Sequence, residues 1–542
     1  METFCGSKLW DQQLTWNTTN PDLTPCFQKT ILAWVPFGFL WLLAPWETFN
    51  LLTSKNRYIP WTVINILKLI LTSVLAFLAL VELSHNVHRS VALAETVPNV
   101  DFQTPFLKLI SFLLVIVLVL TGRVRGIVSS GVQFFFWVLL AISGLVTYRS
   151  IIQEAVNEMT IRDIATFSTA MIYYPVVLVC LILSCFADAK PQYREYQPSP
   201  DEDECPEQNS SFLSRLLFSW FTEMTLIGWK RSLVQSDLWA LNFEDKAENV
   251  VPKFDRYWQE QISRCQILSS SATYSPRRQN REEVKFAHTP TKIQPNIVTA
   301  LWKTFAPLFL YGSLCKVFHD LIIFVNPQLL KLLIGFVSSN EPVWKGIFYA
   351  VLMLVASSIQ SLTLSFYYHH MYIVGMRMRT TIISAIYRKA LVMSNAAYRK
   401  STVGEVVNLM SVDAQRIMDL MNFLNLLWSA PLQIILAMYF LWNVLGAAVF
   451  AGVGLMVLMI PLNGVIASFS RKLQAKQMKT KDQRIKLMNE VLNGIKVLKL
   501  YAWEEPFQQQ ILNIRLSEVQ DLKKIAYLNA VNVFLWISAP FL

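Results

Sequence analysis

The chain has 542 residues, of which 54% are hydrophobic and only 16% are charged, and its mean hydropathy is +0.37. These values exclude a disordered chain and an ordinary soluble domain, and they are typical of an integral membrane protein. The formal net charge of +11 could suggest nucleic-acid binding. The basic residues, however, lie between the apolar stretches, where membrane topology places them. We therefore expect a lipid bilayer as the surroundings and no nucleic-acid partner.

A polar N-terminal tail precedes the first apolar stretch, which begins near Ile31, so we expect no cleavable signal peptide. Cys5 and Cys26 flank a glycosylation sequon at Asn17. If the tail is extracellular, we expect a glycan at Asn17 and a disulfide between the two cysteines. The alternative is two free thiols and an unused sequon. The sequon at Asn209 lies in a segment that should be cytoplasmic, and no cysteine spacing predicts a metal site.

The first 188 residues contain apolar stretches long enough to cross a bilayer. They lie at about 30–50, 62–84, 105–122, 131–148 and 169–187. Basic residues occupy the first and third loops and follow the fifth stretch, at Lys55, Arg57, Arg123, Arg125, Lys190 and Arg194. The positive-inside rule then places the N-terminus outside and residue 190 inside. We predict a five-helix N-terminal transmembrane domain over 1–188 and interpret it as an accessory or partner-binding module.

A cytoplasmic linker is predicted over 189–300, because the composition changes sharply at its start. The segment FLSRLLFSWF (212–221) predicts an amphipathic helix, either at the inner membrane face or packed on protein. A second helix is expected within 236–262, beginning just before LWAL. Residues 268–295 are polar and poor in aliphatic side chains, which predicts disorder.

A second membrane block, over 301–542, follows a different pattern. Apolar stretches at about 305–337, 347–376, 417–442 and 447–470 alternate with long basic amphipathic segments. From Gly346 to Ser394 the pattern is helical and free of proline, which gives roughly 70 Å of helix, more than twice the bilayer core. The part of this helix that extends beyond the bilayer is strongly basic. We therefore predict two helical hairpins that project into the cytoplasm.

Two segments form the expected tips of these hairpins. The first is SNAAYRKSTVGEVVNLMSVDAQRI (394–417), in which Gly404 and Glu405 open a helix. The second is RIKLMNEVLNGIKVLKLYAWEE (484–505), whose apolar periodicity predicts one helix, with Pro506 as its stop signal.

These two tips carry a specific resemblance. STVGEVVNLMSVDAQRI and NEVLNGIKVLKLYAWEEPF resemble the two intracellular loops of an ABC exporter membrane domain. Together with the five-span block and a linker that contains LWALN, the chain is similar to the multidrug resistance-associated proteins of the C subfamily. The resemblance implies an all-α polytopic fold with a lasso-like linker and a six-helix type 1 exporter domain. A chain that stops at Leu542 would have one helix fewer, which suggests an N-terminal portion or a truncated gene model.

The same resemblance implies that both tips are coupling helices, which dock into nucleotide-binding domains. The residues expected to take part are Ser401, Gly404, Glu405, Asp413, Asn493, Gly494, Tyr501, Trp503 and Glu504.

Ionisable residues inside a span are costly and suggest function. Lys316, His319 and Asp320 occur in one expected span, at spacings that place them near one helix face. One interpretation is a Lys–Asp ion pair that neutralises itself. The other is a cationic patch that faces a water-filled cavity and binds the carboxylates of an organic anion.

The resemblance implies further substrate contacts. Lys316 and His319 match family positions that contact the polar part of a glutathione-like conjugate, and Leu364 matches a lining position on the next helix. Trp536 matches the tryptophan of an apolar half-pocket. Phe423 stands where better-known relatives carry a tyrosine, so we expect that hydrogen bond to be missing.

The function implied is ATP-driven efflux of organic anions, drugs and glutathione, glucuronide or sulfate conjugates, by alternating access. The chain contains no GxxxxGK[ST] phosphate loop, so we expect ATP and magnesium to be bound by nucleotide-binding domains outside it. The expected location is the plasma membrane, or alternatively a vacuolar or lysosomal membrane. The rival functions are a sulfonylurea-receptor-like regulatory subunit of a channel and a membrane scaffold that transports nothing.

Overall fold

The protein is described here by a computed structural model that covers residues 2–54, 58–92, 97–158, 163–190, 204–273, 295–339, 341–394 and 403–538. Within these ranges the chain is helical, apart from turns and an isolated bridge between Glu204 and Ala240. Eight helical stretches of the described chain are long and apolar enough to cross a membrane. The predicted all-α polytopic class is confirmed.

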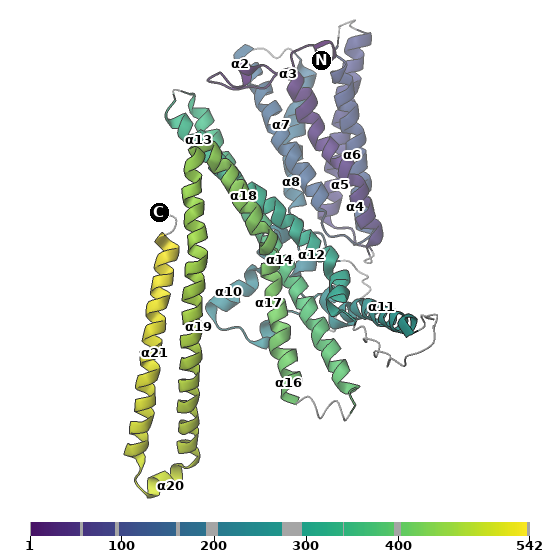
Figure 1. The fold of residues 1–542 in the computed structure, drawn as a ribbon. Coiled ribbons are helices and arrows are strands. Elements are labelled where there is room, and N and C mark those ends of the chain that lie inside the picture. Colours follow the sequence, from purple (N-terminus) through teal and green to yellow (C-terminus); the bar gives the residue numbers. More distant parts are fainter. Residues whose placement is uncertain are drawn as a thin grey trace, which may run out of the picture. The chain divides into compact units, whose positions relative to one another are not determined.

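Five long helices form the N-terminal bundle (Figure 1). They are α4 (Ala33–Thr53), α5 (Val63–Val91), α6 (Val100–Val124), α7 (Gly131–Glu158) and α8 (Ile164–Ser184), one for each predicted stretch. Each helix contributes a fully buried apolar side chain to a shared core, namely Phe37, Leu75, Phe112, Phe136 and Val177. Lipid tails are as apolar as these side chains, so in a bilayer such a core is held together mainly by van der Waals packing.

The core helices begin with α12 (Ile297–Ile322), α13 (Val325–Val337) and α14 (Val343–Leu391). The 49-residue α14 confirms the predicted long helix. The stretch 305–337, expected as one segment, is divided at Ile323–Phe324. Pro327 explains the division, because it has no N–H group to donate to the carbonyl oxygen of Ile323. The chain continues through α16 (Val403–Asn408), a π-helical turn and α17 (Ala414–Leu424), which packs on α14.

Residues 427–542 form a separate compact unit. Its helices are α18 (Leu426–Leu445), α19 (Val449–Asn493), α20 (Ile495–Leu500) and α21 (Glu504–Ser538). The long helices α19 and α21 lie side by side and antiparallel, with α20 at the turn between them (Figure 1). Buried carboxylates on α21 bind basic residues of the hairpin: Glu518 contacts Arg484 at 2.8 Å and Arg515 at 2.9 Å, and Asp521 contacts Lys476 at 3.1 Å.

The single helix predicted over 484–505 is wrong. The structure divides this segment into the end of α19, the short helix α20 and the start of α21. Ala502 has a left-handed backbone with φ of +53°, which reverses the chain before Glu504. Pro506 is therefore no stop signal. It lies in the first turn of α21, where a missing N–H group costs no hydrogen bond.

The linker also differs from the prediction. Residues 212–221 do not form one helix: α9 (Phe212–Leu216) ends, Phe218 adopts φ of +56°, and α10 (Thr222–Lys230) follows a 3-10 turn. The next long helix, α11 (Ala247–Thr273), begins after LWAL rather than before it. Residues 268–273, expected to be disordered, have helical backbone within α11, and residues 274–294 lie outside the described chain.

The corrected start of α11 has a local cause. Asp237 accepts two hydrogen bonds of 2.6 Å from the guanidinium of Arg231 and one of 2.9 Å from the backbone N–H of Val234. These bonds close a turn at the point where the sequence alone suggested a helix N-terminus, because an aspartate can cap a turn as readily as a helix.

The linker contacts α14 through three ion pairs. Glu207 contacts His369 at 3.1 Å, Asp245 contacts Arg377 at 2.6 Å, and Asp255 contacts Arg388 at 2.6 Å. Apolar packing supports these pairs, because Val250 and Phe254 of α11 share a buried cluster with residues of α12, α14 and α17. The linker is therefore attached to the core helices along much of its described length.

Candidate coupling and substrate sites

The turn that carries α20 is fixed by backbone hydrogen bonds. The N–H of Tyr501 donates to the carbonyl of Val497 at 3.1 Å, and the N–H of Trp503 donates to that of Leu498 at 3.1 Å. Leu498 is 7% exposed and holds α20 against the hairpin. A 2.9 Å ion pair between Lys499 and Glu504 joins α20 to the start of α21. The Lys499 hydrogen bond and charge lower the pKa of the Glu504 carboxyl.

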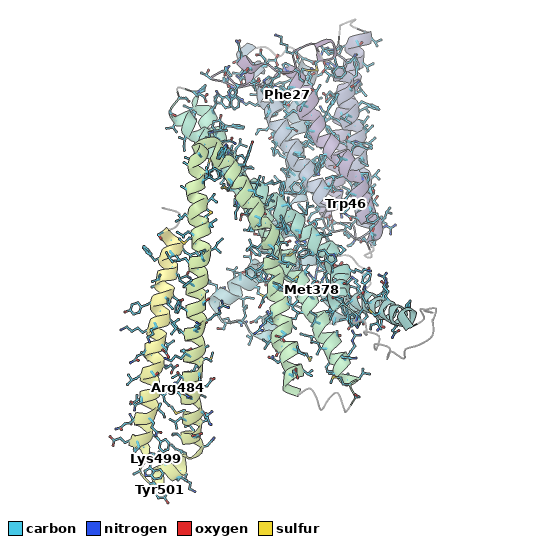
Figure 2. The ribbon with its side chains drawn as sticks, viewed as in Figure 1. Phe27, Trp46, Met378, Arg484, Lys499 and Tyr501 are labelled. Carbon is cyan, nitrogen blue, oxygen red and sulfur yellow. A yellow bond between two sulfur atoms is a disulfide. The ribbon has the colours of Figure 1, made fainter. Side chains whose placement is uncertain are left out.

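The outer side of this turn is apolar and exposed. The exposed fractions are 54% for Val497, 76% for Leu500, 65% for Tyr501 and 53% for Trp503. The rings of Tyr501 and Trp503 lie 5.4 Å apart. Figure 2 shows Tyr501 and Lys499 at the very end of the hairpin, with Arg484 further along α19. We call Val497, Leu500, Tyr501 and Trp503 the tip patch.

Two other predicted residues of this tip lie where α19 ends and the turn begins. Asn493 ends α19, and Gly494 follows with φ of −95° and ψ of 12°. A Cβ atom on Gly494 would approach the carbonyl oxygen of Glu490 to 3.2 Å, which is a tight contact. These residues shape the turn and leave the surface contacts to the tip patch.

The first predicted tip is described only in part, because Ser401 lies outside the described residues. Gly404 and Glu405 are exposed on α16, as expected for the opening of a helix. Asp413 closes the π-helical turn and contacts Arg416 at 3.6 Å.

The ionisable residues of α12 are buried together. Lys316 and Asp320 form an ion pair of 2.8 Å, and the Asp320 side chain is 0% exposed. His319 is 5% exposed, and its Nδ1 atom is hydrogen-bonded to the carbonyl of Gln360 on α14 at 3.2 Å. The geometry thus contains the self-neutralising pair that the sequence left open as one interpretation.

The structure adds neighbours that sequence reasoning missed. The Lys316 ammonium lies 5.8 Å from the ring centre of Tyr367, within reach of a cation–π contact. The Tyr367 hydroxyl donates to the carbonyl of Asn422 at 3.0 Å, which links α14 to α17. A tyrosine three residues after Leu364 on one helix face was the only signal available in the sequence.

The other predicted substrate residues lie on different helices and differ in exposure. Leu364 is partly buried against the cluster of Phe309, Tyr367 and Met371. Phe423 on α17 is 65% exposed, and Trp536 on α21 is 67% exposed. Trp536 belongs to the separate unit 427–542, and Lys316 belongs to the unit 1–426.

Neither a nucleotide nor a metal site is assigned to this chain. The 542 residues contain no phosphate loop of the GxxxxGK[ST] type. Among the described residues, no group of three or more His, Cys, Asp or Glu side chains could hold a metal ion. We derive no step through ATP or magnesium from the residues present.

Comparison with known proteins gives two family matches. Residues 309–542 match the ABC transporter transmembrane region, and residues 3–167 match the ABC transporter TMD0 domain. The chain is 45% identical over 99% of its length to ATP-binding cassette sub-family C member 3 of Mus musculus, covering 35% of that protein. It is 44% identical to the Homo sapiens member 3 and 36% identical to sub-family C member 2 of Rattus norvegicus, in each case over its full length and 36% of theirs.

The five-helix bundle and the long helical hairpins are thus the membrane part of an ABC transporter. Within that class, the chain belongs to the C subfamily, the multidrug resistance-associated proteins. It spans about a third of the length of the curated relatives that it matches.

Proposed function

We propose that this chain supplies the membrane part of an exporter of organic anions, including glutathione, glucuronide and sulfate conjugates, that works by alternating access. ATP hydrolysis is performed by nucleotide-binding domains that are not part of the described structure. The bundle 1–188, the linker 189–300 and the block 301–542 act as separate domains. The protein resides in the plasma membrane with its N-terminus outside, which fits the exposed Asn17 and the Cys5–Cys26 disulfide.

The tip patch is the observation that carries this proposal. An exposed apolar surface at the end of a stiff, ion-paired hairpin suits a part that is gripped by another domain and transmits rigid-body motion. Gly404, Glu405 and Asp413 on the first tip serve the same docking, as does Glu504 beside the tip patch.

The coupling role is tested with Tyr501→Ala and Trp503→Ala in vesicles that carry the chain together with its nucleotide-binding domains. ATP-dependent uptake of a labelled glutathione conjugate should fall at least roughly tenfold, as for loss of interface anchor residues. Tyr527→Ala is the matched control, because Tyr527 on α21 is equally exposed at 63%. Equal uptake in the tip and control variants would exclude the tip patch as a coupling surface.

The substrate role of Lys316 and His319 needs a variant that does not leave Asp320 without its lysine. The double variant Lys316→Met/Asp320→Leu removes the whole pair, and we expect it to lose conjugate uptake. Lys345→Met/Glu341→Leu is the control, since Lys345 is also a buried lysine in an i,i+4 pair, at 3.4 Å. Undiminished uptake in the first double variant would contradict the assignment of Lys316.

A channel-regulating subunit is the second candidate, and the Lys316–Asp320 pair is compatible with it. A lysine neutralised by its neighbour is a structural feature that a subunit without a substrate can also use. This function is supported if ATP-dependent uptake is absent in the unmodified protein and a channel co-purifies with it.

A further inference from the structure

A cavity of about 610 Å³ lies where the linker meets the N-terminal bundle and the core helices. Its walls come from α4, α7, α9, α12 and α14, of which four are candidate membrane spans. The volume falls within the roughly 300–1,000 Å³ of typical ligand sites. Phe212 fixes α9 at this place, because its ring packs at 5.5 Å from those of Phe134 and Phe135.

Most charged groups on the cavity wall are already paired with one another. Asp245 and Glu244 contact Arg377 at 2.6 and 3.5 Å, Glu207 contacts His369 at 3.1 Å, and His370 is hydrogen-bonded to the carbonyl of Phe366 at 2.8 Å. Two ionisable wall residues form no ion pair within the described chain: Arg215 of α9, which interacts with Glu207 only through its charge, and Glu47 of α4.

Arg215 has most of its hydrogen-bonding capacity free. Of its five N–H donors, one is used by the Ser129 hydroxyl, which accepts from Nη2 at 3.1 Å. Its Nε atom is buried and has no partner among the described residues. A partly buried guanidinium with a buried, unbonded Nε atom is costly, and an anion in the cavity would lower that cost.

Glu47 lines the same cavity. Its side chain is only 6% exposed and interacts with the hydroxyl of Ser130, the residue next to Ser129. Neighbouring serines thus hold a cationic and an acidic side chain at one wall of the cavity. Phe218, Tyr311 and Phe366 form an aromatic wall of the same cavity.

We propose that this cavity binds a phosphoethanolamine group, with its phosphate on Arg215 and its ammonium on Glu47. A two-carbon zwitterion matches one guanidinium and one carboxyl group held by adjacent residues. A primary ammonium donates hydrogen bonds to a carboxylate, whereas a quaternary ammonium is typically held by an aromatic cage. The group can belong to a phospholipid, whose glycerol and acyl chains would contact the aromatic wall, or to a soluble phosphoethanolamine ester.

This proposal does not depend on the proposed transport function, because it concerns a different set of residues and is read out by binding alone. The 542-residue chain is reconstituted in phosphatidylcholine bilayers that contain minor amounts of phosphatidylethanolamine and phosphatidylglycerol. Native mass spectrometry then identifies the lipid retained. We expect selective retention of phosphatidylethanolamine.

Two variants and a control define the site. Arg215→Gln should lower retention roughly tenfold or more, as for loss of a charge-assisted hydrogen bond. Glu47→Gln should abolish the preference over phosphatidylglycerol. Arg231→Gln, an exposed linker arginine outside the cavity, should change neither. Unchanged thermal unfolding shows that a variant is folded. If Arg215→Gln does not fold, it is replaced by Arg215→Lys, which keeps the charge.

The outcomes separate the sources and the alternatives. Displacement of the lipid by soluble phosphoethanolamine, or binding of the soluble ester with no lipid retained, supports the site and identifies which source occupies it. Equal retention in the unmodified chain and in Arg215→Gln overturns the proposal. A preference of the unmodified chain for phosphatidylglycerol overturns the zwitterionic assignment.

Discussion

At the scale of single residues, the buried Lys316–Asp320 pair dominates the middle of α12. Both side chains are almost fully removed from solvent, at 10% and 0% exposure. Breaking a buried ion pair from one side is much more costly than replacing both partners, because one charge then stays behind without its counterpart. This asymmetry decides how any variant of Lys316 must be interpreted.

We expect Lys316→Met alone to destabilise the protein by roughly 3–5 kcal/mol. The double variant Lys316→Met/Asp320→Leu should recover most of this loss. The measurement is thermal unfolding in detergent. Equal stability of the single and double variants would show that the pair does not act as a unit.

Gly375 is a second residue whose identity is dictated by its neighbours. A Cβ atom there would lie 2.9 Å from the carbonyl oxygen of Met418, where α14 and α17 approach closely. Gly375→Ala should therefore cost roughly 1–3 kcal/mol, as overpacking does. Gly454→Ala in α19 meets nothing within 4 Å and should be neutral or stabilising, since alanine favours helix. A stable Gly375→Ala variant would show that the two helices can separate without cost.

At the scale of elements, the contact between the linker and α14 depends on pH through the carboxyl group of Glu207. The hydrogen bond from His369 lowers the pKa of the Glu207 carboxyl, and Asn242 adds a further donor at 2.9 Å. A lowered pKa in the folded state means that the contact stabilises the protein above the ordinary glutamate pKa of about 4.3. This stabilisation is lost as the pH falls through the lowered value.

We expect the linker to loosen from α14 when the pH falls from 7 to below about 4. Spin labels at Gln208 and Ser365, both exposed, would report a broader distance distribution at the lower pH. In Glu207→Gln the distribution should already be broad at pH 7 and change little. A pH response retained by Glu207→Gln would assign it to another group.

The elements also show how far sequence reasoning reaches. Apolar stretches predicted every long helix of the N-terminal bundle, because a membrane span requires a long apolar run that no other local feature imitates. The breaks at Phe218 and Ala502 could not be predicted, since both are non-glycine residues with left-handed backbone. At Ala502 the conformation is held by backbone hydrogen bonds of the turn, such as that from the N–H of Trp503 to the carbonyl of Leu498 at 3.1 Å.

The candidate sites also contain features that the local sequence predicts and features that it does not. The spacing of Lys316 and Asp320 allowed an ion pair, and the structure forms it. By contrast, the contacts of Glu207, Asp245 and Asp255 join residues more than a hundred positions apart, so no local pattern indicates them. The cavity beside Arg215 is missed for this reason as well.

At the scale of the whole molecule, the N-terminal tail contacts the start of α14. Trp16 and Trp344 pack edge to face at 5.4 Å, and the indole N–H of Trp344 donates to the carbonyl of Thr18 at 2.9 Å. Lys345 lies 5.0 Å from the ring centre of Trp16. The Cys5–Cys26 disulfide closes the tail on its other side, with the two Cα atoms 5.3 Å apart.

We expect Trp344→Ala to release this tail, because it removes both the ring contact and the hydrogen bond. Limited proteolysis of the folded chain should then cleave within residues 11–24 at least several-fold faster, since cleavage follows local opening. Trp442→Ala, an exposed tryptophan of α18, is the control. Equal cleavage in both variants would show that Trp344 does not hold the tail.

The contact between Thr18 and Trp344 also fixes an order of events during synthesis. The two residues are separated by 326 positions, which takes a ribosome roughly tens of seconds to translate. On the proposed topology, with the N-terminus outside, the disulfide needs only the tail and its first span, α4, in place at an oxidising compartment. The tail is therefore closed covalently long before its contact with α14 exists, and a newborn chain must keep Trp16 unattached until the start of α14 has been made.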